Sequence, residues 1–350
     1  MSQKLFFATN RVLNKIDAGI PDFTDVPIAS GAPIVWAAAT IDKIDTTDQD
    51  SGKIMAITPL NAGGLSDGDL NDIVSSPNDI VVFIHGADND FNDSLTRAAY
   101  NQAWLGEQKI PGGNKTYDMI AFSWPGRSYD LSSLVSILHV GDDYCHDQDS
   151  ANASGPHLCQ FFKTLYALRE KIGTRRMSLL AHSMGCLALG GGVEQWFSAA
   201  DRPGHPLFDE VILAAGDENC TSLHASDGGR LTNLYRLGRE ISVYFNRNDT
   251  LMHLSSVANE AYHLGFNGPP NKASLDVFPA KIYEFIDCDG LRAENYLSHA
   301  GDHRHQYYRE APIVRLDIAT ALAGLVPKRP IHNPKLNYYA FFDFDTSGQI

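Results

Sequence analysis

Short apolar runs alternate along the chain with stretches of helical apolar spacing. Five runs are nearly continuous, which is typical of strands buried on both faces of a sheet. They are residues 80–84, 119–123, 177–180, 210–215 and 241–245. Further strands are predicted at residues 5–13, 34–44, 53–59 and 281–286. Apolar spacing predicts helices at residues 92–108, 155–172, 233–239, 251–263 and 308–325.

This alternation predicts an α/β fold with a doubly wound, mostly parallel sheet and helices on both of its faces. Neither an internal repeat nor a low-complexity linker divides the 350 residues. We therefore expect one domain over residues 1–326, with residues 127–150 as a lid or insertion. Residues 327–350 are expected to be a tail packed on that domain. Residues 61–78 are rich in Gly, Asp and Ser and predict a surface loop.

The composition argues against some classes of binding partner but does not identify a substrate. The formal net charge is -14 and the chain has no basic block, which argues against nucleic acid or an anionic membrane surface as the main partner. The sequence has no apolar run long enough to span a bilayer, and its first ten residues lack the apolar region of a signal peptide. A cytoplasmic location is therefore expected. The five cysteines are scattered and form no C-x-x-C pair, so they indicate neither a disulfide framework nor a zinc site.

A lone serine, Ser183, stands between a predicted strand and a predicted helix. Ala181 and Gly185 flank it by two positions, where a tight turn admits only small side chains. This is the pattern of the G-x-S-x-G nucleophile elbow, with alanine in place of the first glycine. The helix that follows would bring free N–H groups and its positive dipole end to the hydroxyl. The alternative role of Ser183 is to cap that helix.

With this elbow placed, the chain resembles the α/β-hydrolases, and more closely a bacterial α/β-hydrolase family of unknown function. The matching pieces occur in the order that the fold requires and cover roughly residues 5 to 325. They are Phe-Ala-Thr-Asn-Arg at 7–11 and the segments 82–86, 122–125, 180–185, 211–217 and 305–308, with the segment around Asp249.

The chain departs from this family at one place. In members of the family, the Trp-Pro motif, which is Trp124-Pro125 in this chain, is followed almost directly by a segment with the pattern Tyr…Asp…Ser-Ala. Here residues 127 to about 143 intervene before Tyr144, Asp149, Ser150 and Ala151, which resemble that segment.

A serine hydroxyl becomes a nucleophile when a base takes its proton, and an acid orients that base. In this fold the acid and then the histidine follow the serine along the chain. Asp249 comes just after the strand at 241–245 and is the expected acid, although it also suits the cap of the next helix. Asp217, after the preceding strand, is its main rival. Asp287 and Asp289 come too late in the order.

Three histidines follow the last predicted strand by position, and each is a candidate base: His299, His303 and His305. We favour His305, because the His-x-Tyr-Tyr pattern at the start of the closing helix resembles the histidine of the family. The other two are then solvated loop residues. A metal site at residues 302–305 is disfavoured, since the chain offers neither an H-E-x-x-H motif nor cysteine ligands there. We expect no metal and no cofactor.

An oxyanion hole needs two backbone N–H groups, and the fold supplies them from the residue after the serine and from the loop after an earlier strand. Met184 and Ala87 are the expected donors. Gly86 lets the backbone approach closely. His85 is expected to brace this loop rather than to act in catalysis. With His85 and Gly86, Trp124 is expected to line the substrate site.

The insertion after the Trp-Pro motif has apolar residues at helical spacing, at positions 131, 134, 135 and 138. This apolar face is either a lid or acyl-binding wall, to which Leu134 and Leu138 would contribute, or a surface packed on the domain. The acidic run at 142–149 predicts a solvated loop. Calcium binding there is disfavoured, because the EF-hand spacing is absent.

These features predict a serine hydrolase that cleaves a small-molecule carboxylic ester through an acyl-enzyme, without a cofactor. An amidase, thioesterase or lactonase on the same fold is an alternative. So is a binding protein on a retained hydrolase fold, because fold alone does not give function. A dehalogenase is disfavoured, since that chemistry places a carboxylate at the elbow. The sequence predicts no oligomeric state.

Overall fold

The computed structural model describes residues 2–48, 50–129, 141–200, 202–279, 281–292, 296–297, 304–329, 331–333 and 338–341. Within these residues, twelve strands form one sheet in the order β13-β14-β12-β11-β10-β9-β7-β8-β1-β4-β5, with β6 beside β4. A separate two-stranded hairpin consists of β2 (Arg11–Asp17) and β3 (Ile20–Pro27).

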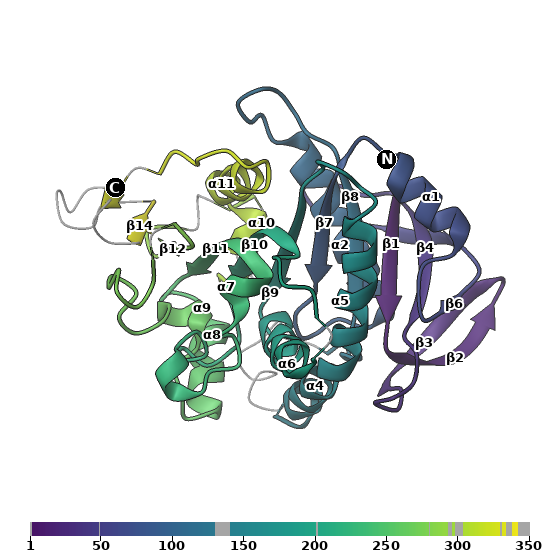
Figure 1. Cartoon of the computed structure of the whole chain (residues 1–350), viewed down its shortest axis with the longest axis horizontal. Coiled ribbons are helices and arrows are strands. Elements are labelled where there is room, and N and C mark those ends of the chain that lie inside the picture. The colour runs from purple at the N-terminus through teal and green to yellow at the C-terminus, as the bar shows by residue number, and fades with distance from the viewer. Residues whose placement is uncertain are drawn as a thin grey trace.

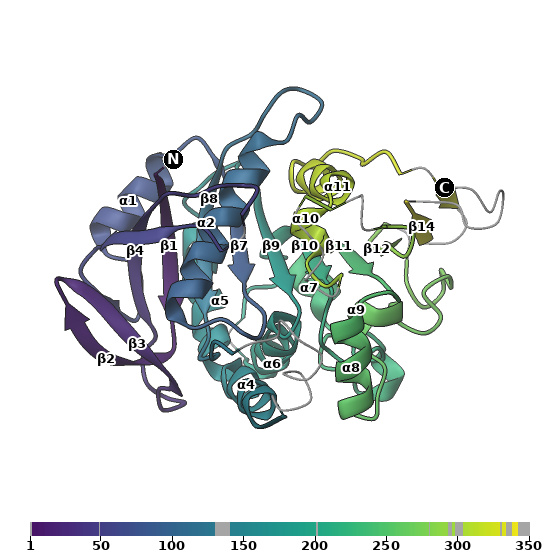
Figure 2. The same cartoon turned by 180° about the vertical axis from the view of Figure 1, so that it is seen from behind.

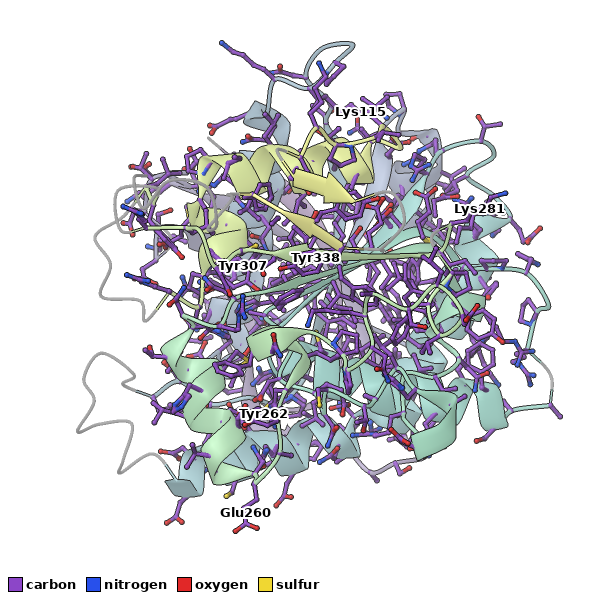
Figure 3. The ribbon with its side chains drawn as sticks, turned by 90° about the vertical axis from the view of Figure 1, so that its left-hand side faces the viewer. Lys115, Glu260, Tyr262, Lys281, Tyr307 and Tyr338 are labelled. Carbon is purple, nitrogen blue, oxygen red and sulfur yellow. The ribbon has the colours of Figure 1, made fainter. Side chains whose placement is uncertain are left out.

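The central part of the sheet is parallel from β1 to β14. Its strands are β1 (Gln3–Thr9), β7 (Asp79–Ile84), β8 (Tyr117–Ser123), β9 (Met177–His182), β10 (Phe208–Ala214), β11 (Gly238–Phe245), β12 (Tyr283–Asp287) and β14 (Tyr338–Ala340). Antiparallel strands extend both edges: β4 (Val35–Asp42), β5 (Lys53–Ile57), β6 (Asn61–Ala62) and β13 (Ile331–Asn333). Tyr338 lies near the β13 edge in Figure 3.

Helices cover both faces of this sheet (Figures 1 and 2). Apolar side chains of α2 (Phe91–Glu107), α10 (Tyr307–Glu310) and α11 (Pro312–Leu322) pack in one core. The core on the opposite face takes side chains from α1 (Asp67–Ser75), α4 (Gly141–Ala153), α5 (Gly155–Arg169), α6 (Gly185–Ser198), α7 (Leu234–Leu237) and α9 (Leu264–Asn267). In β7, Val82 belongs to the second core and its neighbours Val81 and Phe83 to the first. This two-sided burial of a parallel sheet confirms the predicted fold class.

The order of the strands determines where a site can form. From β7 the chain passes to β8 on one side, then returns across β7 to β9 on the other. At such a reversal, the loops after two neighbouring strands diverge and leave a crevice at their carboxyl ends. Here these loops begin at His85, after β7, and at Ser183, after β9. The candidate residues of the sequence therefore meet at the place where this fold binds ligands.

Two predicted loops are helical instead. Residues 61–78 contain β6 and α1, and α1 begins with a side-chain cap in which Ser66 Oγ accepts from the Asp69 N–H at 3.1 Å. The acidic run at 142–149 lies in α4, where Asp147, Ser150 and Ala151 are buried. Both helices are short and mostly polar, so few apolar residues mark their buried faces.

The amino-terminal prediction is also corrected. One strand was expected over residues 5–13, and no other strand was predicted before residue 34. The structure ends β1 at Thr9, starts β2 at Arg11 and adds β3 at Ile20–Pro27. Asn10 separates the two strands because its side chain turns to the helix side, where Nδ2 donates to Ser154 Oγ at 3.0 Å. No helix in the described part of the chain is both long enough and apolar enough to cross a membrane.

Candidate active site

Ser183 occupies a sharp turn between β9 and α6. Its φ is +52°, a left-handed conformation that costs free energy for any residue other than glycine. Its backbone N–H donates to Ala214 O at 3.0 Å, and its carbonyl accepts from the Cys186 N–H at 2.9 Å. Hydrogen bonds to the next strand and to the first turn of α6 thus hold the serine in this strained position.

Two glycines let the loop after β7 touch the turn at Ser183. A Cβ on Gly86 would lie 2.8 Å from Ser183 Cβ, and a Cβ on Gly185 would lie 2.5 Å from His85 O. Real Cβ atoms do not come so close to such neighbours. The sequence pattern around the serine therefore has a direct steric cause, which is the contact between the two loops.

Asp249 and His305 form a buried pair. His305 Nδ1 donates to Asp249 Oδ2 at 2.7 Å, and the side chains are only 5% and 0% exposed. The other carboxylate oxygen, Oδ1, accepts from the Met252 N–H at 3.0 Å and caps α8 (Thr250–Ala258). Burial raises the pKa of Asp249, and its hydrogen-bonded partner His305 opposes this effect. The carboxylate thus has both roles that the sequence allowed, helix cap and partner of a histidine.

The loop that carries His305 packs against the residue that precedes the serine. The His305 ring lies 4.8 Å, centroid to centroid, from the ring of His182, which directly precedes Ser183. Two residues after His305, the Tyr307 hydroxyl donates to Tyr244 O at 2.8 Å and accepts from the Ala215 N–H at 3.0 Å. It thereby ties the loop to the ends of β10 and β11, and Figure 3 shows Tyr307 against the sheet.

Asp217, the alternative candidate for the acid, is hydrogen-bonded to a different histidine, His263. Its carboxylate accepts from His263 Nδ1, from Ser255 Oγ at 2.5 Å and from the Tyr144 hydroxyl at 3.0 Å. Although burial alone would raise the pKa of Asp217, the His263 hydrogen bond and charge bring it below its usual value. The Asp217 backbone N–H donates to Ser183 O at 2.9 Å. A second aspartate–histidine pair therefore lies next to the serine turn, while His305 is paired with Asp249.

The N–H groups of the two expected oxyanion donors, Ala87 and Met184, have no acceptor among the described residues. Ala87 lies in the loop 86–90, which we call the oxyanion loop, and Met184 precedes the first turn of α6. Unpaired N–H groups of this kind are expected at the start of a helix, and they suit an anionic oxygen.

His85 and Trp124 hold the oxyanion loop against its neighbour. Their rings are stacked 4.7 Å apart with an interplanar angle of 7°, and the Trp124 Nε1–H donates to His85 O at 2.7 Å. The His85 ring nitrogens lie 2.8 Å from Gly86 O and 3.1 Å from Trp124 O. Burial lowers the pKa of His85 to about 3, so the ring is neutral at neutral pH. Both rings brace the backbone, and their contact with a substrate stays a prediction.

Several predicted site residues fall outside the described part of the chain. They are the alternative bases His299 and His303 and the lid residues Leu134 and Leu138. Among the described residues, no group of three or more His, Cys, Asp or Glu side chains is placed to hold a metal ion.

Sequence reasoning missed residues that bind the backbone of the site. Arg11 and Asp147 contact the oxyanion loop, and Tyr307 fixes the His305 loop. The signals available were the Ala-Thr-Asn-Arg motif for Arg11 and the acidic run for Asp147. The resemblance matched Asp149 to the family's aspartate, but Asp149 is exposed and Asp147 is the buried one.

Asp88, in the oxyanion loop, gives the site a pH-dependent stability. Burial raises its pKa from 3.8 to about 7, and its φ is +57°. The folded state therefore binds this proton more tightly than the unfolded state, and the free energy of unfolding falls as the pH rises from about 4 to 7. We expect Asp88→Asn to stabilise the protein more at pH 8 than at pH 5, by about 1–2 kcal/mol after discounting for solvent screening.

Thermal melts of both proteins at the two pH values measure this difference. Asparagine keeps an oxygen that accepts from the Tyr129 N–H, which Asp88 Oδ1 accepts at 2.6 Å. An equal shift of the melting temperature at both pH values would mean that Asp88 does not titrate in this range.

The parallel sheet, the turn at Ser183 and the flanking loops define an α/β-hydrolase. The chain belongs to the family described as alpha/beta hydrolase of unknown function (DUF900), whose family model matches residues 67–320. A search of the curated proteins finds no match. Among solved structures the chain is similar to phospholipase PlaB from Legionella pneumophila, with 15% sequence identity and a TM-score of 0.24. The similarity covers 65% of this chain and 42% of that one, and it does not bear on the substrate.

Proposed function

We propose that this hydrolase cleaves carboxylic esters of small molecules through an acyl-enzyme, with Ser183 as nucleophile, His305 as base and Asp249 as the acid that orients the base. The observation that carries the proposal is the buried hydrogen bond of 2.7 Å from His305 to Asp249, on a loop packed against the residue before Ser183. The order serine, aspartate, histidine along the chain is that of the fold's catalytic triads.

In this mechanism His305 Nε2 takes the Ser183 proton as the serine oxygen attacks the ester carbonyl. The negative charge that develops on the carbonyl oxygen is held by the N–H groups of Met184 and Ala87. When the intermediate collapses, the bond to the alkoxide breaks and His305 returns the proton to that oxygen. Water, activated by the same imidazole, then hydrolyses the acyl-enzyme and releases the acid.

Thioesters, lactones and amides are alternative substrates of the same machinery, and a non-catalytic binding protein is the alternative of another class. Esters are favoured because an alkoxide leaves more readily than an amide nitrogen. The mechanism requires no cofactor.

The test is covalent labelling with a fluorophosphonate probe, followed by peptide mass mapping, beside turnover of matched p-nitrophenyl ester and p-nitroanilide substrates. We expect the label on Ser183, ester turnover that greatly exceeds anilide turnover, and neither label nor turnover in Ser183→Ala. A folded wild-type protein that takes no label would support the binding protein. Label without a preference for the ester would support the amidase.

A further inference from the structure

A fully buried arginine holds one side of the oxyanion loop. Arg11 is 1% exposed, and its guanidinium donates to Asn89 O at 3.0 Å, to Gly126 O at 2.8 Å and to Ser123 Oγ at 3.0 Å. The first acceptor belongs to the oxyanion loop, and the other two to the end of β8 and the loop after it. One planar side chain therefore joins the loops that follow two neighbouring strands.

The local sequence explains why the arginine points there. Thr9 Oγ1 donates to Ser123 O at 2.7 Å and accepts from the Arg11 N–H at 3.1 Å, which pins the end of β1 to the end of β8. The strand β1 ends at Thr9 and β2 begins at Arg11, so the Arg11 side chain lies beside the end of β8 and reaches both loops. The Ala-Thr-Asn-Arg motif thus has a structural task at the carboxyl end of the sheet, although it precedes the oxyanion loop by more than seventy residues.

A buried carboxylate holds the opposite side of the same loop. Asp147, in α4, is 0% exposed and accepts from the Asp88 N–H at 3.2 Å and from the Arg127 N–H at 3.0 Å. Asp88 is the residue whose φ of +57° turns the oxyanion loop away from β7. The carboxylate therefore holds the strained residue next to Ala87, and it ties the loop to the segment after Gly126.

Within the described part of the chain, Arg11 and Asp147 form no hydrogen bond with each other, and most of their partners are backbone groups. The other partners are Ser123 Oγ for Arg11 and His146 Nδ1, at 3.4 Å, for Asp147. Burying the two charged side chains costs desolvation free energy, and apolar residues would stabilise a core at least as well. What charged groups add is strong, directional hydrogen bonds that fix the position of a backbone segment. The segment fixed here contains Ala87, whose N–H is a proposed oxyanion donor.

We propose that Arg11 and Asp147 are positioning residues that hold the Ala87 N–H in place for the transition state. This inference rests on the proposed function. Neither side chain touches the substrate; each acts through the backbone of the oxyanion loop, from opposite sides. The N–H must meet the oxygen of the tetrahedral intermediate rather than that of the bound ester. A loosened loop should therefore lower kcat and leave KM almost unchanged.

The variants are Arg11→Lys and Asp147→Asn. Lysine has a single ammonium group that cannot serve three acceptors arranged around a planar fork, and asparagine has one acceptor oxygen for two N–H groups. We expect each variant to lower kcat by about 10- to 100-fold with KM within about twofold. The affinity for a trifluoromethyl ketone, which binds as an oxyanion adduct of the serine, should fall by the same factor as kcat.

The control residues, Arg175 and Asp209, also bind backbone groups, at the other end of the sheet, and each pairs in addition with a charged side chain. Arg175 donates to Ile73 O at 2.6 Å, and Asp209 accepts from the Met177 N–H at 3.0 Å. We expect Arg175→Lys and Asp209→Asn to lower the melting temperature and leave kcat and ketone affinity unchanged. All rates are divided by the concentration of sites that a fluorophosphonate titrates, so that misfolded protein does not count. If one variant fails to fold, the other still tests its own side of the loop.

The outcomes separate this inference from the function on which it rests. Wild-type protein that labels at Ser183, with variants that keep kcat and ketone affinity, would overturn the inference and leave the hydrolase proposal standing. A rise in KM at constant kcat would also overturn it, because ground-state binding would then have been lost. Wild-type protein that takes no label would overturn both.

Discussion

Ser183→Gly is expected to lose ester turnover by on the order of 10⁵-fold or more and yet to unfold at a higher temperature than Ser183→Ala. The loss follows from removal of the proposed nucleophile. The gain follows from the backbone, because Ser183 has a φ of +52° and glycine adopts this conformation without steric cost. Alanine at this position retains the steric cost of the left-handed conformation. We expect a difference of about 1 kcal/mol, which is about 1–2 °C for a chain of this size.

Both variants are measured by p-nitrophenyl ester turnover and by differential scanning calorimetry. The comparison of glycine with alanine is the control, since both lack the hydroxyl and differ in their tolerance of the turn. Turnover that survives in both variants would remove Ser183 from the chemistry. Loss of turnover with equal melting temperatures would keep Ser183 as nucleophile but would show that the turn stores no strain.

The five parallel strands β7 to β11 could be predicted because each is a nearly continuous apolar run. Residues 80–84 and 241–245 were expected to be strands, and β7 and β11 contain them. Burial on both faces removes polar residues from such a strand, so the signal in the sequence is strong. The helices α1 and α4 bury few residues and were predicted as loops. The contact between α4 and the oxyanion loop is made by Asp147. A pattern of apolar positions predicts that such a charged residue is exposed to solvent.

In the candidate site, too, some residues could be predicted from the sequence and others could not. Ser183 could be found because its neighbours must be small, and the contacts of Gly86 and Gly185 show why. Asp249 and His305 were placed by chain order and resemblance, and the structure brings the two side chains together across 56 positions of the sequence. Arg11 and Tyr307 could not be assigned a role in this way. Most of their partners are backbone carbonyl and N–H groups, which no sequence motif marks.

The two aspartate–histidine pairs beside Ser183 make the identity of the acid the sharpest remaining test. Asp249→Asn is expected to lower kcat by on the order of 10⁴-fold. The Asp249 carboxylate serves both His305 and the Met252 N–H, whereas an amide has one acceptor oxygen. If the amide oxygen accepts from the Met252 N–H, the NH₂ group faces His305 Nδ1. It then favours the His305 tautomer that is protonated at Nε2. This tautomer cannot accept the serine proton.

Asp217→Asn is the matched comparison, because it removes a carboxylate from an equally buried histidine one strand away. Burial lowers the pKa of His263, but Asp217 and Glu218 raise it above its usual value, and the variant removes the stronger of these two partners. Removing one member of a buried pair costs about 3–5 kcal/mol. We therefore expect Asp217→Asn to melt at a distinctly lower temperature, with kcat of the folded protein within about tenfold of the wild type. If kcat instead collapses in Asp217→Asn and survives in Asp249→Asn, the roles of acid and base pass to Asp217 and His263. The base that acts on Ser183 would then be His263, paired with an aspartate that follows β10. The pair Asp249–His305 would have a structural role.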